Sequence, residues 1–79
     1  MTRGEYLVGI NFNPSSDDLV SNIKRKAADL IDLFESIPSE KEDPFQQQEI
    51  LLLKEVSVRS IETAAMYAVK AATKPSPLQ

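Results

Sequence analysis

Three of the nine cations in this chain, Lys24, Arg25 and Lys26, stand in a row, although the net charge is −3. They follow the predicted start of a helix, whose first N–H groups and positive dipole end favour an anion. Phe12 and Asn13 come directly before that helix, and an aromatic ring offers a face on which a base can stack. Ring, helix N-terminus and lysine together could hold a nucleotide, by stacking on its base and by charge on its phosphate.

The surroundings of these cations leave two interpretations open. Lys24 and Lys26 fall on the two shoulders of the apolar seam of their helix, where a lysine can lay its stem over apolar surface and present its ammonium at a subunit boundary. Alternatively, Lys24 pairs with Asp17 or Asp18, and Phe12 packs as a hydrophobic staple ahead of the helix.

Carboxylates offer a second possible chemistry. Asp29, Asp32 and Glu35 are spaced i, i+3, i+6, a spacing that some helical pyrophosphohydrolases use to hold magnesium, but no second carboxylate pair faces them. The chain has no His and no Cys, which removes the commonest general base and the ligands of a closed zinc site. Its only glycines are Gly4 and Gly9, so it has no glycine-rich phosphate loop. We expect no metal and no enzymatic activity.

The first of two predicted helices spans about 14–37. Asn13 is a good N-cap, Pro14 suits the first helical position, and Pro38 disfavours helical geometry at the residue before it. Apolar residues are spaced 3, 4, 3, 4, 3, as in a heptad seam, at Val20, Ile23, Ala27, Leu30, Phe34 and Ile37.

The second predicted helix spans about 44–74, with Asp43 as its cap and Pro44 at its first position. Its seam consists of Leu51, Lys54, Val58, Ile61, Ala65, Ala68 and Ala72, and Lys54 interrupts it. Further apolar residues, Leu52, Val56, Met66 and Tyr67, lie on other faces. A helix that is apolar most of the way round is covered by more than one neighbour. We therefore expect copies of the helix pair to associate; a larger bundle with the N-terminal segment as a third layer is the alternative.

Residues 1–12 differ from the rest of the chain. Tyr6, Val8, Ile10 and Phe12 share one side of an extended chain, which predicts a short strand or a docking arm. The predicted fold is all-α: this extended arm at 1–12, an antiparallel two-helix hairpin at 13–74 and a disordered tail at 75–79, assembled as a homo-oligomer.

The composition of the chain argues against two classes of partner, duplex nucleic acid and membranes. An acidic chain lacks the basic face that duplex nucleic acid requires, so we expect no such partner. No apolar run approaches the ~20 residues of a membrane span, so we expect no membrane association. The absence of Cys fits a cytoplasmic protein.

Two stretches, "FNPSSDDLVSNIKRKAADLIDLFE" and "RSIETAAMYAVKAATKP", resemble the helices of small phage proteins that sequester cyclic-nucleotide messengers. These are the anti-CBASS sponges, related through their helical hairpin to the anti-Thoeris sponges. The resemblance covers about residues 12–37 and 57–75. It implies a hexamer in the host bacterial cytoplasm during infection. It also implies cyclic dinucleotides bound between protomers, cyclic trinucleotides at a separate site in some members, and immune evasion without cleavage of the messenger.

The resemblance also suggests site residues. The lysine of the family's first helix corresponds to Lys24, and the stacking aromatic corresponds to Phe12, or to Tyr6 if the arm folds back. Asn13 and Lys26 complete this predicted ligand site. A second ligand site is predicted near the end of the second helix, at Arg59, Thr63 and Lys70. A helical adaptor that only oligomerises is the alternative function, and a magnesium-dependent nucleotide pyrophosphohydrolase is a second.

Overall fold

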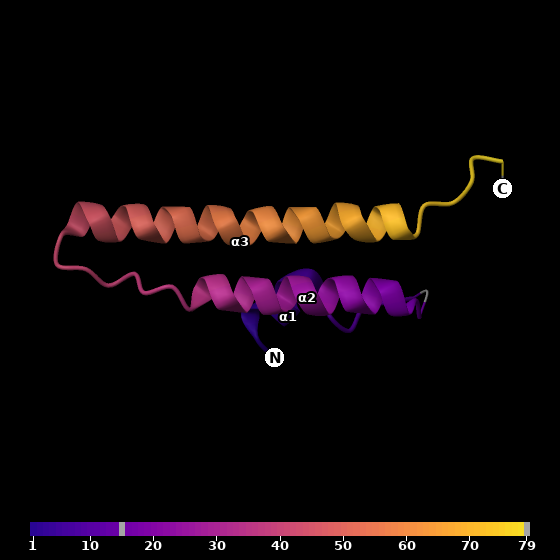
Figure 1. Ribbon diagram of the computed structural model, residues 1–79, viewed down its shortest axis with the longest axis horizontal. Helices are drawn as coiled ribbons and strands as arrows, with labels where there is room; N and C mark the ends of the chain where they lie inside the picture. The colour runs from indigo at the N-terminus through magenta and orange to yellow at the C-terminus, as the bar shows by residue number, and fades with distance from the viewer. Residues whose placement is uncertain (15, 79) are drawn as a thin grey trace.

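The computed structural model describes residues 1–14 and 16–78, and its described part contains three α-helices and no strand (Figure 1). The helices are α1 (Arg3–Val8), α2 (Asp18–Glu35) and α3 (Pro44–Ala72). The predicted all-α class is confirmed. Ser15, inside the first predicted helix, and Gln79, in the predicted tail, lie outside the described residues. None of the three helices combines the length and the hydropathy that crossing a membrane requires.

The chain reverses direction after α2, so that α3 runs back along it, and α1 packs mainly on α2 (Figure 1). The molecule is elongated, at 57 × 25 × 13 Å, and is therefore about one helix thick. Few apolar side chains are buried in so thin a body, and among the described residues they are Val20, Ala28, Ile31, Val58 and Ala65. Much of the apolar surface of α3 has no partner within the chain.

The extended arm or strand predicted for residues 1–12 is wrong, because this segment contains α1. The Thr2 hydroxyl accepts a hydrogen bond from the Glu5 N–H at 3.1 Å, and the Glu5 carboxylate accepts one from the Thr2 N–H at 2.8 Å. This reciprocal capping box satisfies N–H groups that a helix start otherwise leaves free. Gly9 ends the helix at φ 64°, a left-handed conformation that favours glycine.

The first predicted helix begins four residues too early. Asp17, not Asn13, is the N-cap of α2, and its carboxylate accepts from the Leu19 N–H at 2.8 Å. Ser16 lies at φ 52°, which a continuous α-helix does not permit. The Asn13 side-chain amide instead donates to the Asp17 carbonyl at 2.9 Å, so it braces the chain ahead of the helix.

Helix α3 begins at Pro44, the residue that the sequence predicts, and its Asp43 cap accepts from the Phe45 N–H at 2.9 Å. It ends at Ala72, two residues before the predicted end. Val58 and Ala65 of the predicted seam are buried, so this part of the helix faces α2.

Lys54, which interrupts that seam, contacts the end of α2. Its ammonium donates to the Glu35 carbonyl at 3.0 Å and to the Ile37 carbonyl at 2.7 Å. Carbonyls at a helix C-terminus have no partner within the helix and carry partial negative charge. The lysine therefore ties α3 to the point where α2 ends.

Replacing Lys54 by methionine is expected to lower the free energy of unfolding by about 1–2 kcal/mol, because two carbonyls lose a charged donor. Urea unfolding followed by circular dichroism measures this change. Lys70→Met on the same helix, at an exposed residue, is the matched control. Equal midpoints for the two variants would contradict the role given to Lys54.

Candidate functional site

All three helices line one groove with a volume of about 560 Å³, here called the three-helix groove. Residues 6–9 of α1 and its cap form one wall, α2 supplies Lys24, and α3 supplies residues between Glu62 and Val69. Most of the lining is apolar, with Tyr6, Thr63, Lys24 and Glu62 as its polar side chains. An apolar groove with a few convergent polar groups is the usual form of a small-molecule site.

Lys24 differs most from its prediction. It is only 7% exposed, so it does not lie on an open shoulder of α2. Its ammonium donates to the Gly9 carbonyl at 3.1 Å and to the Phe12 carbonyl, and lies 5.4 Å from the centre of the Phe12 ring. Carbonyls therefore hold this lysine, and not Asp17 or Asp18. Because an ammonium has three N–H donors, two carbonyls leave one for a ligand.

The aromatic residues predicted to stack are both exposed. Tyr6, on α1, is 74% exposed and lines the three-helix groove. Phe12 is 72% exposed, so it does not pack as a staple, and it lines a smaller hollow of about 380 Å³. Tyr6 and Gly9 line both the hollow and the three-helix groove, so the two adjoin at α1 and its cap.

The remaining residues of the first predicted site do not converge. Lys26 is exposed and does not line the three-helix groove. Besides its bond to the helix start, Asn13 donates to the Ser21 hydroxyl at 2.8 Å, so its amide has a structural role. The structure therefore brings Tyr6 and Lys24 together, and leaves Asn13 and Lys26 outside the groove.

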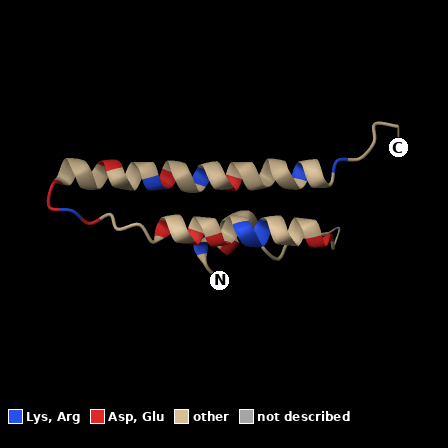
Figure 2. Cartoon of the chain, viewed as in Figure 1, with Lys and Arg blue, Asp and Glu red and all other residues tan. Residues whose placement is uncertain are grey.

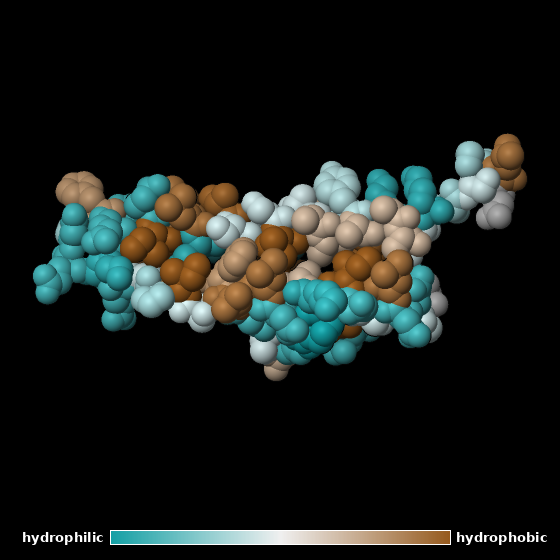
Figure 3. Space-filling view, viewed as in Figure 1, coloured by the Kyte–Doolittle hydropathy of each residue, from teal (hydrophilic) through white to brown (hydrophobic). Residues whose placement is uncertain are grey.

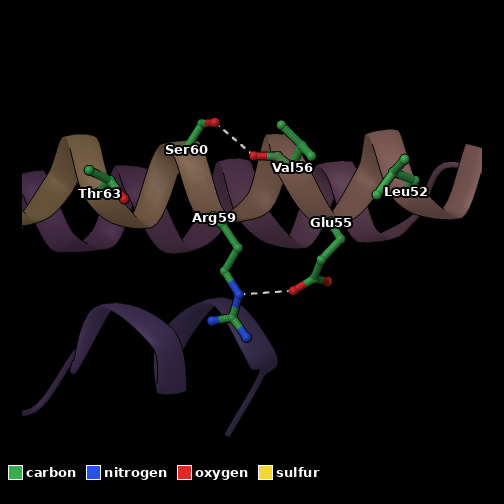
Figure 4. Close-up of a pocket in the computed structure, with 6 residues that line it drawn as sticks. All are labelled: Leu52, Glu55, Val56, Arg59, Ser60 and Thr63. Carbon is green, nitrogen blue, oxygen red and sulfur yellow. Dashed lines mark hydrogen bonds and ion pairs between the residues drawn. The ribbon is translucent and has the colours of Figure 1, made fainter.

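The second predicted site is divided. Arg59 and Thr63 line a shallow hollow of about 480 Å³ on α3 (Figure 4), whereas Lys70 does not line it. In Figure 4, Arg59 and Glu55 point toward the indigo ribbon of α1. Arg59 is paired with Glu55 at 2.9 Å and with Glu62 at 3.0 Å. Thr63 also lines the three-helix groove, which places it in reach of Tyr6 and Lys24.

Helix α1 packs against one row of residues on α2. The sequence analysis did not identify this row. Lys24, Ala28 and Asp32 are four residues apart and therefore share one face of the helix. The Gly4 N–H donates to the Asp32 carboxylate at 2.8 Å, and a Cβ at Gly4 would lie 2.2 Å from the Ala28 carbonyl oxygen. Since Lys24 holds Gly9, helix α1 runs antiparallel to α2 along this row.

Figure 2 shows blue and red residues on α1 and on α2, and ion pairs between such residues border the same contact. Arg25 donates to Glu5 at 2.8 Å, and Arg3 joins Glu35 of α2 to Glu55 of α3. The hydrogen bond from Arg25, followed by that from the Thr2 N–H, lowers the pKa of Glu5 to about 2. Glu5 therefore stays ionised at any pH near neutrality.

The carboxylates of the magnesium alternative do not form a site. Asp29 accepts from Arg25, Asp32 from the Gly4 N–H, and Glu35 is paired with Arg3. Nowhere in residues 1–14 and 16–78 do three carboxylates gather so that they could hold a metal ion. The geometry gives the pyrophosphohydrolase alternative no support.

Helix α3 also carries an exposed row of side chains, three of which are large and apolar. Leu52, Val56, Ser60, Thr63 and Tyr67 are spaced 4, 4, 3 and 4, as on one helix face. At about 100° per residue, this outer row lies nearly opposite the buried row that faces α2. Leu52, Val56 and Tyr67 are each more than half exposed. Figure 3 shows further brown, apolar surface on the viewed face of the molecule.

Comparison with protein-family models, with curated proteins and with solved structures finds no match to this chain.

Proposed function

We propose that this chain binds a cyclic dinucleotide or a related cyclic nucleotide messenger and sequesters it without cleaving it. The observation that carries the proposal is the convergence of Tyr6 and Lys24, which are 18 residues apart in sequence, on one groove. The folding back of residues 1–12 as α1 brings them together.

The groove has the dimensions and the chemistry for such a ligand. Its volume of about 560 Å³ lies within the ~300–1,000 Å³ of small-molecule sites. The exposed ring of Tyr6 offers a stacking face, and the hydroxyl of Thr63 can donate or accept a hydrogen bond. Lys24 supplies a positive charge that little water surrounds, so its attraction for a phosphate is less screened than that of a surface lysine.

The chemistry of the lining supports binding without turnover. The chain has no His or Cys, and Glu62, the one carboxylate among the described residues that line the groove, accepts a hydrogen bond from Arg59 at 3.0 Å. Lys24 is bound to two carbonyls, so its ammonium is held as a donor and not as a base. Under this proposal the protein lowers the free concentration of a messenger in the host bacterial cytoplasm during phage infection.

The outer row of α3 supports a homo-oligomer. A molecule 13 Å thick cannot enclose a nucleotide by itself, so a neighbouring copy would close the groove. Leu52 and Val56 would be buried in that contact, whereas in one chain they are more than half exposed. The resemblance to messenger sponges favours a hexamer with cyclic dinucleotides between its protomers. No duplex nucleic acid and no membrane takes part in the proposed function.

A helical adaptor that oligomerises without a ligand is the second candidate. The same exposed row favours it, because that row needs a protein neighbour whether or not a messenger binds. A titration with cyclic nucleotides separates the two candidates.

Replacing Tyr6 by alanine is expected to weaken the binding of 3′,3′-linked cyclic GMP-AMP by about tenfold or more, because stacking contributes ~1–3 kcal/mol per base. Calorimetric titration measures the affinity, with a cyclic trinucleotide as a second injectant. Phe45→Ala is the matched control, since Phe45 is similarly exposed on α3 but lines neither the groove nor the outer row.

Absence of heat from the unsubstituted protein with both nucleotides would favour the adaptor. Binding that Tyr6→Ala and Phe45→Ala leave equally strong would place the ligand outside the three-helix groove. Degradation of the nucleotide during the titration, followed by chromatography, would overturn sequestration without cleavage.

A further inference from the structure

Helix α1 depends on α2 for its existence. It has six residues, and isolated helices shorter than ~12–15 residues are marginal in water. Its capping box stabilises the first turn, but a cap alone does not offset the unfavourable free energy of nucleating a helix. Undocking of α1 would therefore also unfold it, and the wall of the groove that carries Tyr6 would be lost.

The contacts that hold α1 differ in strength. The pairs Arg25–Glu5 and Arg3–Glu55 join side chains that are about a quarter to a half exposed, and such pairs contribute little to stability. The bond from the Gly4 N–H to Asp32 is part-buried, and Gly4 itself is buried. A buried N–H that loses its acceptor is far more costly than a broken surface pair.

The contact at Gly4 is also specific in shape. A Cβ at this position would meet the Ala28 carbonyl oxygen at 2.2 Å and an Asp32 carboxylate oxygen at 2.7 Å. Both distances are too short for any side chain, so α1 reaches Asp32 only because residue 4 is glycine. The Gly4 N–H belongs to the first turn of α1, where N–H groups have no partner within the helix. Asp32 supplies that partner from another helix.

We propose that Asp32 is a positioning residue for messenger binding. Asp32 accepts a hydrogen bond from the Gly4 N–H and so docks α1 on α2, which allows α1 to fold. The docked α1 places Tyr6 in the three-helix groove, which Asp32 itself does not line. This inference rests on the proposed function for its ligand. Its docking step concerns the free protein and is tested without one.

Docking and binding are linked. A ligand that contacts Tyr6 binds only the state in which α1 is docked, so the ligand stabilises α1. If only a fraction of the molecules is docked, the apparent affinity for the ligand falls in proportion to that fraction. The amides of residues 6–9 should therefore exchange more slowly when the messenger is bound. Weakening the Asp32 contact should raise their exchange rate and lower affinity together.

Hydrogen exchange by mass spectrometry and titration with 3′,3′-linked cyclic GMP-AMP test this on the full chain. Asp32→Ala and Gly4→Ala are each expected to speed exchange in residues 6–9 and to weaken binding, both by about tenfold or more. Asp32→Asn should stay within about threefold of the unsubstituted protein, because its amide oxygen still accepts the Gly4 N–H. Asp29→Ala, which removes a carboxylate of the same helix bound to Arg25, is the matched control.

Circular dichroism of each variant verifies that α2 and α3 remain folded. Faster exchange and weaker binding in Asp32→Ala, both restored in Asp32→Asn, would support the positioning role. Unchanged exchange in residues 6–9 of Asp32→Ala would overturn it. Faster exchange with unchanged affinity would overturn it as well, since ligand binding would then not depend on the docking of α1. If the unsubstituted protein binds no cyclic nucleotide, the proposed function fails, and the exchange data still decide whether Asp32 docks α1.

Discussion

Lys24→Met is expected to release residues 9–12 from α2, to lower the free energy of unfolding by about 2 kcal/mol and to reduce messenger binding below detection. The Lys24 ammonium is buried and donates to the Gly9 and Phe12 carbonyls, and hydrogen bonds to charged groups contribute about 1.5–3 kcal/mol each. Methionine keeps the apolar stem of the lysine, so packing changes little. The net loss stays below the sum of two such bonds because the freed carbonyls can turn to water.

Urea unfolding measures the stability of this variant, hydrogen exchange measures the docking of α1, and calorimetry measures binding. Lys26→Met is the matched control, since Lys26 lies two residues away on the exposed side of α2. Loss of binding with unchanged stability and exchange would show that Lys24 contacts the ligand without holding residues 9–12. Retention of all three properties would contradict the role given to Lys24 here.

The long helices could be predicted because their signals are local. Asp43 and Pro44 mark the start of α3, and the predicted seam contains Val58 and Ala65, which are buried, but also Leu51, which is 49% exposed. The start of α2 was misplaced because two capping residues, Asn13 and Asp17, compete there. The left-handed conformation of Ser16, which decides between them, is not evident from the residue type.

Helix α1 was missed although its signals are present. Thr2 and Glu5 have the spacing of a capping box, and Gly9 stands where a helix favours glycine. The alternation of Val8, Ile10 and Phe12 with Gly9 and Asn11 outweighed them, because propensity summed over six residues is a weak signal. What stabilises α1 is the contact of Gly4 with Asp32, 28 residues away, which no local pattern reveals.

The candidate site was predicted only in part, because it too depends on the contact between α1 and α2. Tyr6 and Lys24 were both named, with the condition that the N-terminal segment folds back. The burial of Lys24 could not be inferred while residues 1–12 were treated as extended, because its partners are carbonyls at the end of α1. Asp32 was considered only as a possible magnesium ligand with Asp29 and Glu35, since the acceptor it provides for Gly4 exists only once α1 is docked.

Introducing glutamates at Leu52 and Val56 together is expected to convert the proposed oligomer completely to monomer. Both side chains lie on the outer row of α3 and are more than half exposed, so one chain tolerates the change. In an assembly they would be buried, and an unpaired buried carboxylate is strongly unfavourable. Repetition of the two charges in every protomer multiplies this cost. Sedimentation equilibrium measures the mass, and Leu78→Glu in the exposed tail is the control.

The monomeric variant also tests how the groove is completed. Leu52 and Val56 do not line the three-helix groove, so α1 should stay docked and its amides should exchange as in the unsubstituted protein. Weaker messenger binding with intact docking would mean that a second protomer closes the groove. Unchanged affinity in a monomer would mean that one chain suffices and that oligomerisation serves another purpose. A double variant that keeps its oligomeric mass would contradict the assignment of this row as the interface.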